Sequence, residues 1–234
     1  MKSNSFYKIA LMTIACFVTA VASAQEVRVY VGSAAPTGSY RNYASRGVNL
    51  GTKVDFQVKP HLCLVTSVDL FYNKLQPMVN SSISASKNGY TSTLTPVSIN
   101  VPLMVHAKFT TKSSKQSKDN NPFDLWGEGA IGLNRRYLTQ EKFTAYEFSP
   151  AGTPLRYDGV NSFDAKTTLA HQWGVGVTYR NRVSLGFMWY SLGRAKMTGT
   201  STITYADTGA QQSLPFDNGR LKIRYRALRL GISF

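Results

Sequence analysis

The chain ends in a strand pattern that leaves one face completely apolar. Along the stretch Leu221 to Phe234, the apolar face of the final residues carries Leu228, Leu230, Ile232 and Phe234. Arg229, Gly231 and Ser233 fall on the other face, because successive side chains of a β-strand point to opposite sides. A bare apolar stripe needs a cover of protein or lipid. We therefore predict that this stretch is the closing strand of a β-sheet.

The same period of two recurs along the chain and predicts eight strands. Their ranges are 27–32, 48–58, 62–73, 97–109, 123–137, 169–180, 183–190 and 221–234. Ser-, Gly- and Asn-rich segments join them and are expected to be loops, the longest at 139–166 and 197–218. Long and short connections alternate except at the fourth, 110–121. The pattern predicts an all-β fold, an eight-stranded antiparallel up-and-down transmembrane β-barrel.

The N-terminus is typical of a cleavable signal peptide. Lys2 and Lys8 precede a short apolar run, and Ala22-Ser23-Ala24 supplies small residues for cleavage. We therefore expect a signal peptide at residues 1–24 and a β-barrel at 25–234. Cys16 raises a lipoprotein signal as an alternative, but the apolar run continues beyond it and Thr13 is a poor residue for that signal. Cleavage leaves Cys63 alone, so no internal disulfide is expected.

The chain is strongly basic, with 27 Lys and Arg against 12 Asp and Glu, a formal charge of +15. Such a charge attracts lipid phosphates or nucleic acid, or lines a basic lumen and its loops. The signal peptide and the lack of a base-stacking motif argue against nucleic acid. The three His and single mature Cys show no ligand spacing, so we expect no metal and no cofactor.

Alternation alone does not say which face of a barrel is outside. A soluble eight-stranded barrel keeps its apolar face inside. The unequal loop lengths and the Gly, Ser and mixed charges of the other face favour lipid outside. So do the aromatic residues near the strand ends, which resemble interface girdles: Tyr72, Phe109, Phe123, Tyr179 and Phe234. We predict insertion in the cell outer membrane, with a soluble periplasmic ligand-binding barrel as an alternative.

Charged residues of the inward phase are predicted to form an ion-paired lumen network. The set is Arg28, Lys53, Asp55, Asp69, Glu128, Arg136, Arg180 and Arg224. An eight-stranded barrel is just wide enough to be filled by its side chains, and buried charges must be paired. A narrow polar conduit is the functional alternative.

The histidines allow a lipid-modifying enzyme as another alternative. His106 lies on the inward phase and His171 on the apolar phase. A catalytic base needs its nucleophile within reach, and no sequence pair of Ser and His fixes one. We therefore expect structural roles and no enzyme activity.

Basic residues also gather in or beside the long connections. They are Arg41, Arg46, Lys74, Lys87, Lys142, Arg156, Arg194, Lys196 and Arg220. Either they contact lipopolysaccharide phosphates through charge-assisted bonds or they are general surface charge. Outer-membrane lipids, with lipopolysaccharide among them, are the expected partners.

The chain resembles the outer-membrane β-barrel-domain family of Gram-negative bacteria, of the eight-stranded PorT-like kind. The residues that carry the resemblance are Ile99 to Leu103, the Gly-x-Gly hairpin of Trp173 to Val177 with Leu185 to Phe187 and Tyr190, and the ending Leu230 to Phe234. The resemblance implies insertion by the barrel-assembly machinery, which reads the terminal strand. It implies no particular activity, so we expect a non-enzymatic structural, interaction or assembly role.

Two irregularities are expected within the strands. Pro102 removes a ladder hydrogen bond and predicts a bulge or local widening. In the closing strand, Leu221, Ile223 and Tyr225 have the opposite phase from Leu228 to Phe234. A β-bulge near Arg226-Ala227 would turn the basic residues of the outer half into the lumen. A regular strand would instead place them on the outside.

Overall fold

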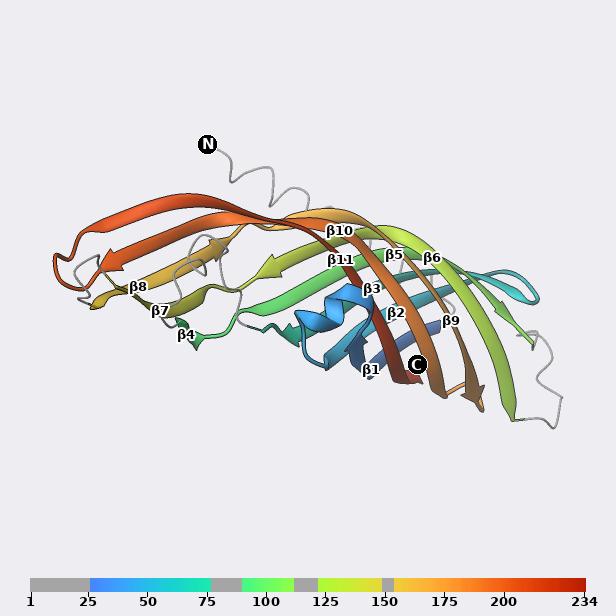
Figure 1. Ribbon diagram of the computed structural model, residues 1–234. Helices are drawn as coiled ribbons and strands as arrows, with labels where there is room; N and C mark the ends of the chain where they lie inside the picture. Colours follow the sequence, from blue (N-terminus) through green and yellow to red (C-terminus); the bar gives the residue numbers. More distant parts are fainter. Residues whose placement is uncertain (1–25, 77–89, 112–121, 149–153) are drawn as a thin grey trace.

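The computed structural model describes residues 26–76, 90–111, 122–148 and 154–234 (Figure 1). Eleven strands and one short 3-10 helix make up this part of the chain. They are β1 (Glu26–Pro36), η1 (Gly38–Asn42), β2 (Gly47–Lys59), β3 (Leu62–Lys74), β4 (Tyr90–Leu94), β5 (Val97–Thr110), β6 (Phe123–Leu138), β7 (Glu141–Phe148), β8 (Pro154–Phe163), β9 (Lys166–Tyr179), β10 (Val183–Tyr205) and β11 (Gln211–Ser233). Within the described ranges, no helix is long and apolar enough to cross a membrane. The predicted signal peptide lies outside these residues.

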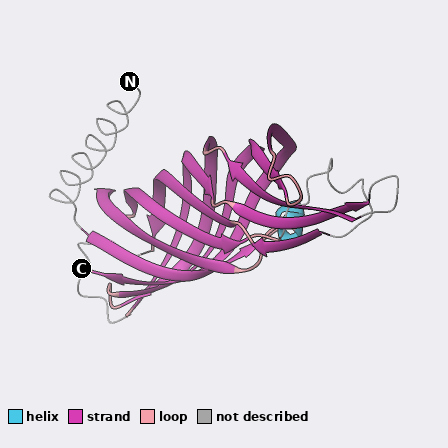
Figure 2. Ribbon diagram, turned by 90° about the vertical axis from the view of Figure 1, so that its left-hand side faces the viewer, coloured by secondary structure: helices cyan, strands magenta, loops and turns pink. Residues whose placement is uncertain are grey.

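Eight of the strands pair as an antiparallel ring. The order is β11-β1-β2-β3-β5-β6-β9-β10, and β10 pairs again with β11. We call these strands the ring. A circuit of paired residues visits Glu26, Asp55, Val65, His106, Ala130, Gln172, Tyr190, Tyr225 and Pro36. The circuit returns to β1 ten residues further along (36 − 26 = 10), and such a stagger tilts the strands steeply, as Figure 2 shows.

The remaining strands form a sheet that projects beyond the ring. Its order is β11-β10-β8-β7-β4, in which β10 contributes Gly199–Tyr205 and β11 contributes Gln211–Asp217. We call it the extension. β10 and β11 therefore run through both parts, and the extension lies at the left of Figure 1, far from the C-terminus.

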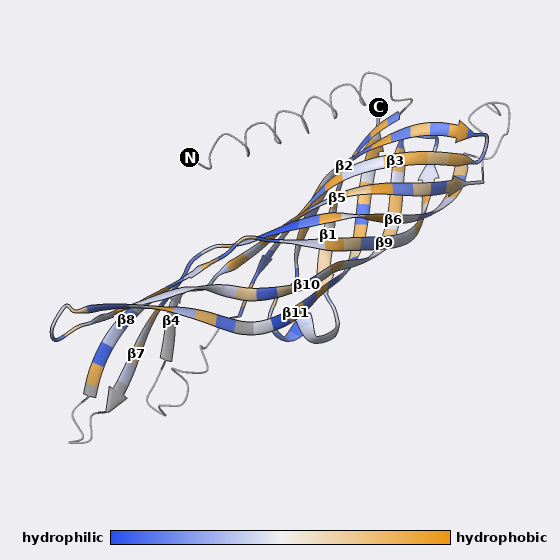
Figure 3. Ribbon diagram, turned by 90° about the horizontal axis from the view of Figure 1, so that it is seen from above, coloured by the Kyte–Doolittle hydropathy of each residue, from blue (hydrophilic) through white to orange (hydrophobic). Residues whose placement is uncertain are grey.

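The ring places its apolar side chains outside and its polar side chains inside. The outward set includes Val31, Leu50, Leu64, Leu70, Leu103, Val105, Leu125, Ile131, Leu133, Leu169, Val175, Leu185, Leu228, Leu230 and Ile232, each more than a third exposed. The buried set includes Arg28, Lys53, Asp55, Asp69, Lys108, Glu128, Arg136 and Arg229. Figure 3 shows apolar colour along the ring strands and more polar colour in the extension. This arrangement is the reverse of a soluble barrel, which buries its apolar face.

The predicted strand count is wrong, since there are eleven strands and not eight. The eight predicted strands all occur, and they are the eight of the ring. The extra ones lie between the predicted strands: β4 lies between the predicted strands 62–73 and 97–109, β7 and β8 occupy most of the expected loop 139–166, and the expected loop 197–218 lengthens β10 and β11. One face of the extension is buried, but it mixes the apolar Phe143, Ala145 and Tyr157 with the polar Glu141 and Asn161, so its apolar alternation is short and broken.

The expected bulge at Arg226-Ala227 is also wrong. β11 alternates without interruption, with Leu221, Ile223, Tyr225 and Ala227 buried and Arg224 and Arg226 exposed. Its pairing with β1 is regular through this region. In the pairing of β10 with β11, the register shifts lie elsewhere, between Ser191 and Arg194 and between Lys196 and Thr198 of β10. The strand keeps its register because the upper interior of the ring is apolar and accepts Leu221, Ile223 and Tyr225.

Pro102 produces no bulge either. β3 and β5 keep one register on both sides of it, but the pairs opposite Val101 and Pro102 are missing from the ladder. The interruption follows from the missing N–H of proline and agrees with the local widening that we expected as the other outcome.

Candidate functional site

The polar interior of the ring is the densest group of chemically active side chains in the described structure. Regular alternation points the inward residues of all eight strands at one another. Five basic side chains are buried there, Arg28, Lys53, Lys108, Arg136 and Arg229, beside three carboxylates, Asp55, Asp69 and Glu128. Glu26 supplies another carboxylate at the end near the termini.

Two ion pairs fill the end of the interior near the termini. Arg28 donates to Glu26 at 2.5 Å and to the Ser233 hydroxyl at 3.0 Å, which ties β1 to the closing strand. Lys108 of β5 donates to Asp55 of β2 at 2.5 Å. Each buried cation here has a carboxylate partner, as desolvated charges require.

Glu128 of β6 is the centre of the middle layer. It pairs with Lys53 across the ring and accepts a hydrogen bond from Gln172 Nε2 at 2.6 Å. His106 Nδ1 lies 3.3 Å from the same carboxylate, and His106 Nε2 lies 2.6 Å from the Ser67 hydroxyl. Side chains of four strands therefore meet at this carboxylate, and Ser67 of a fifth joins them through His106.

Arg229 of β11 organises a second cluster in the middle of the ring. It pairs with Asp69 and donates to Asn49 Oδ1 at 2.6 Å. Its guanidinium lies over the rings of Tyr30, at 4.0 Å, and Tyr190, at 4.8 Å. The Tyr30 hydroxyl also donates to Asp69. Arg229 thus joins the closing strand to β1, β2, β3 and β10.

An aromatic layer fills the interior at the end away from the termini. Phe71 stacks on Tyr225 at 4.8 Å and meets Tyr190 edge-on at 4.8 Å. Tyr40 enters from η1, packs edge-on against Tyr225 at 5.4 Å and is 1% exposed. The interior is therefore filled by side chains along its length.

The eight residues predicted to form the lumen network fall into a buried group and an exposed group. Six of the eight are buried in the ring: Arg28, Lys53, Asp55, Asp69, Glu128 and Arg136. Arg136 has no carboxylate partner among the described residues, and its Nη1 atom has no hydrogen-bond partner there.

The prediction of a lumen position is wrong for Arg180 and Arg224, because both side chains are exposed. Arg180 follows the end of β9, where its φ of 48° turns the chain, and its guanidinium lies over Tyr179 at 5.2 Å. Arg224 faces outward because β11 has no bulge.

The sequence reasoning left two network members out. Lys108 lies on the same phase as His106, and Arg229 lies opposite Leu228 and Leu230. Strict alternation alone would have placed both inside. The residues proposed as an insertion signal, Leu228, Leu230, Ile232 and Phe234, all point outward, with Leu230 51% and Phe234 80% exposed. His171 is exposed on the outside of β9.

The contacts of His106 have the order of a catalytic triad: hydroxyl, imidazole, carboxylate. Ser67 is fully buried, however, and His106 is 1% exposed, so a substrate has no direct access to the hydroxyl. Glu128 is also engaged by Lys53 and Gln172. The arrangement serves to satisfy buried polar groups. Among the described residues, no group of His, Cys, Asp or Glu is placed to hold a metal ion.

No family model matches the chain, and no curated protein matches its sequence. Among solved structures, Neisserial surface protein A is 12% identical with a TM-score of 0.44, covering 89% of this chain and 94% of its own. The attachment invasion locus protein Ail of Yersinia pestis is 12% identical with a TM-score of 0.41, covering 89% and 98%. A major outer membrane protein from Thermus thermophilus is 12% identical with a TM-score of 0.45, covering 89% and 99%. These likenesses are too loose to carry an argument about activity.

Proposed function

We propose that the chain is an integral outer-membrane protein whose ring is an eight-stranded transmembrane β-barrel. The observation that carries this proposal is the inversion of the ring, with apolar side chains outside and paired charges inside. In water, the outward face would expose a continuous apolar surface on every side. In a bilayer, lipid covers that face, and the closed pairing satisfies the backbone groups.

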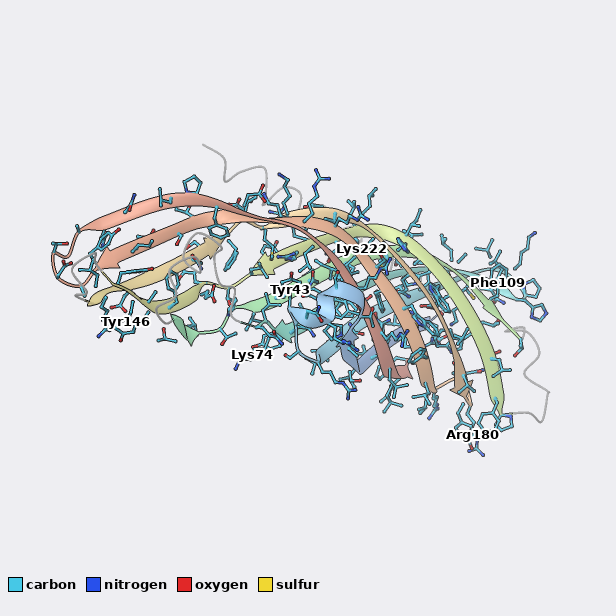
Figure 4. The ribbon with its side chains drawn as sticks, in the orientation of Figure 1. Tyr43, Lys74, Phe109, Tyr146, Arg180 and Lys222 are labelled. Atoms are coloured by element: carbon cyan, nitrogen blue, oxygen red, sulfur yellow. The ribbon has the colours of Figure 1, made fainter. Side chains whose placement is uncertain are left out.

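The outward apolar face has the height that a bilayer needs. On β6 it runs from Phe123 to Leu133 and ends at the exposed Arg135. The ten steps between these residues, at ~3.3 Å each and tilted by ~40°, rise about 25 Å, the height of the apolar band of such barrels. Phe109, Phe123, Tyr179 and Phe234 lie exposed at the end near the termini, and Tyr72 lies at the other. Figure 4 places Phe109 and Arg180 at the first end.

This topology supports an orientation and a role. The start of β1, the C-terminus and the short connections after β2 and β9 lie at one end of the ring, and the extension lies at the other. Outer-membrane barrels keep short turns in the periplasm and long connections outside the cell. The extension then faces the exterior. We propose a non-enzymatic structural or interaction role, which the buried ion pairs and aromatic layer of the interior support.

Membrane fractionation with a heat-modifiable gel shift tests this proposal. The protein should partition with outer membranes, resist extraction by carbonate, and migrate faster unheated than boiled. Recovery in the soluble periplasmic fraction would support the ligand-binding alternative and overturn the proposal. Deleting Phe234 should lower the amount of gel-shifted protein if the assembly machinery reads the terminal strand.

A lipid-modifying enzyme is the second candidate, because Ser67, His106 and Glu128 lie in triad order. It requires Ser67 to become accessible. Ser67→Ala and His106→Ala, with His171→Ala beside them, should leave the acylation of lipid A unchanged. A change seen with Ser67→Ala and His106→Ala, but not with His171→Ala, would establish the enzyme instead.

A further inference from the structure

The outer half of β11 carries a row of basic side chains on the outside of the ring and its junction with the extension. We call Arg194, Arg220, Lys222, Arg224 and Arg226 the basic stripe. Arg220, Arg224 and Arg226 are exposed, and Lys222 is half-buried. Figure 4 places Lys222 where the ring passes into the extension. Among the described residues, none of the five forms an ion pair.

Like charges oppose one another across the two strands at this point. Arg194 of β10 pairs with Lys222 of β11, and Lys196 pairs with Arg220. Like charges directly opposite in a sheet are destabilising. Lys196 is neutralised by Asp217 at 2.8 Å, whereas the pair of Arg194 and Lys222 has no described carboxylate. A bound anion would relieve this repulsion.

The stripe meets the apolar face at a sharp boundary. Arg226 is followed on the same face by Leu228 and Leu230. Opposite Arg226 lies Trp189, which stacks on Trp173 at 3.7 Å with an interplanar angle of 7°. Tryptophan is enriched at the level of lipid headgroups. Acyl chains would therefore cover Leu228 and Leu230 while the headgroup reaches Arg226 and Arg224.

We infer that the basic stripe binds the phosphate groups of a phosphorylated glycolipid of the outer leaflet, of the lipid A class. The inference rests on the proposed function, since lipid reaches the stripe only if the ring spans the membrane. The long-connection end lies in the outer leaflet in that orientation. Guanidinium groups bind phosphate through charge-assisted, often bidentate hydrogen bonds, and the adjacent apolar face fits the acyl chains.

The test compares two variants that each lose three positive charges. One is K222Q/R224Q/R226Q, in the stripe. The matched control is K59Q/R180Q/R182Q, whose three residues are exposed at the opposite end of the ring. Each protein is placed in phosphatidylcholine nanodiscs, and binding of bisphosphorylated lipid A, of dephosphorylated lipid A and of inorganic phosphate is measured.

The stripe variant should bind bisphosphorylated lipid A about tenfold more weakly than the unchanged protein, the loss expected for a few solvated charge-assisted contacts. The control should change less than about twofold, as screened distant charges do. Dephosphorylated lipid A should bind the unchanged protein as weakly as bisphosphorylated lipid A binds the stripe variant.

Three results would overturn the inference: an unaltered affinity in the stripe variant, an equal loss in the control, or equal binding of dephosphorylated lipid A. Inorganic phosphate binding as tightly as lipid A would show a free-phosphate site and overturn the lipid assignment. The heat-modifiable gel shift separates this outcome from failure of the proposed function. If the unchanged protein shows the shift and fails to bind lipid A, only the inference fails.

Discussion

The ring and the extension share two strands but expose opposite kinds of surface. Along β11, the ring part shows Leu228, Leu230 and Ile232 to the outside, whereas the extension part is a run of exposed polar residues with Leu214 among them. Inside the ring, ion pairs are buried, as between Lys53 and Glu128. In the extension, the pair of Lys196 and Asp217 is about half exposed. One strand thus carries two different kinds of surface.

The difference teaches that the surroundings of a strand, more than its β-propensity, decide its sequence pattern. In the proposed membrane-spanning ring, lipid on one side and a polar interior on the other require strict alternation. The extension buries only a short apolar cluster, Phe143, Ala145 and Tyr157, so its pattern is weaker. Changes of the same chemical kind should therefore have unequal effects in the two parts.

Removing the central carboxylate of the ring should have the largest effect. Glu128→Ala leaves Lys53 buried without its partner, and we expect a loss of about 3–5 kcal/mol in the free energy of unfolding. Urea unfolding in lipid vesicles, read by the gel shift, measures it. Asp158→Ala, at an exposed site in the extension, should leave the midpoint unchanged. The double variant Lys53→Met with Glu128→Leu should recover most of the loss, and a loss equal to that of Glu128→Ala would contradict the pairing argument.

The second-largest difference in stability between the ring and the extension should come from a charge introduced at an outward-facing site. Leu230 lies midway between Arg226 and Phe234 on the outward face of β11, near the centre of the apolar band. Leu230→Arg should cost about 2–4 kcal/mol in lipid vesicles, the penalty for arginine near the midplane of a barrel. Leu214→Arg, at a similarly exposed site in the extension, should change stability by less than about 0.5 kcal/mol. Equal effects at the two sites would mean that lipid does not surround the ring.

The sequence predicted the ring because an apolar outside and a polar inside give each strand a repeating alternation. The eight predicted strands are the eight that pair around it, and strict alternation places even Lys108 and Arg229 correctly. The strands of the extension have a weaker apolar alternation. The stretch Gly199 to Tyr205 contains three Thr, one Ile and one Tyr, so its β-propensity was a signal, but its buried residue, Ser201, is polar and no apolar period reveals the strand.

The closing strand shows where sequence reasoning failed and why. A bulge was predicted because outward arginines are incompatible with a strand that faces lipid along its whole length. The structure keeps the strand regular, since Tyr225 and Ile223 find apolar partners inside and Arg224 and Arg226 lie beyond the apolar face. Those partners are Phe71, Tyr190 and Tyr40, which come from distant parts of the chain. No local sequence pattern predicts these contacts.

Two glycines with left-handed backbone extend the comparison, one near the junction of the ring with the extension and one at the far end of the extension. Gly193 has a φ of +87°, and a Cβ there would lie 2.6 Å from the Leu169 carbonyl oxygen. Gly209, near the tip of the β10–β11 hairpin, has a φ of +65° and open space around a Cβ. Gly209→Ala should cost about 1 kcal/mol from backbone strain alone. Gly193→Ala should cost about 2 kcal/mol or more, because backbone must also move. Comparable unfolding midpoints for the two variants would contradict this account.

The smallest effect concerns an exposed carboxylate of the extension. The pKa of Asp217 is lowered from its ordinary value, first by the hydrogen bond from Lys196 and then by the Gly219 backbone N–H. A lowered pKa in the folded state contributes stability above the unfolded-state pKa, and that contribution is lost as the pH falls through the folded value. Lys196→Met should raise the pKa of Asp217 toward its ordinary value, as an NMR titration of the side-chain carboxyl would show. Lys74→Met, on β3 of the ring, provides the control and should leave it unchanged. An unaltered titration in Lys196→Met would mean that water already screens this pair completely, which would widen the contrast with the buried pairs of the ring.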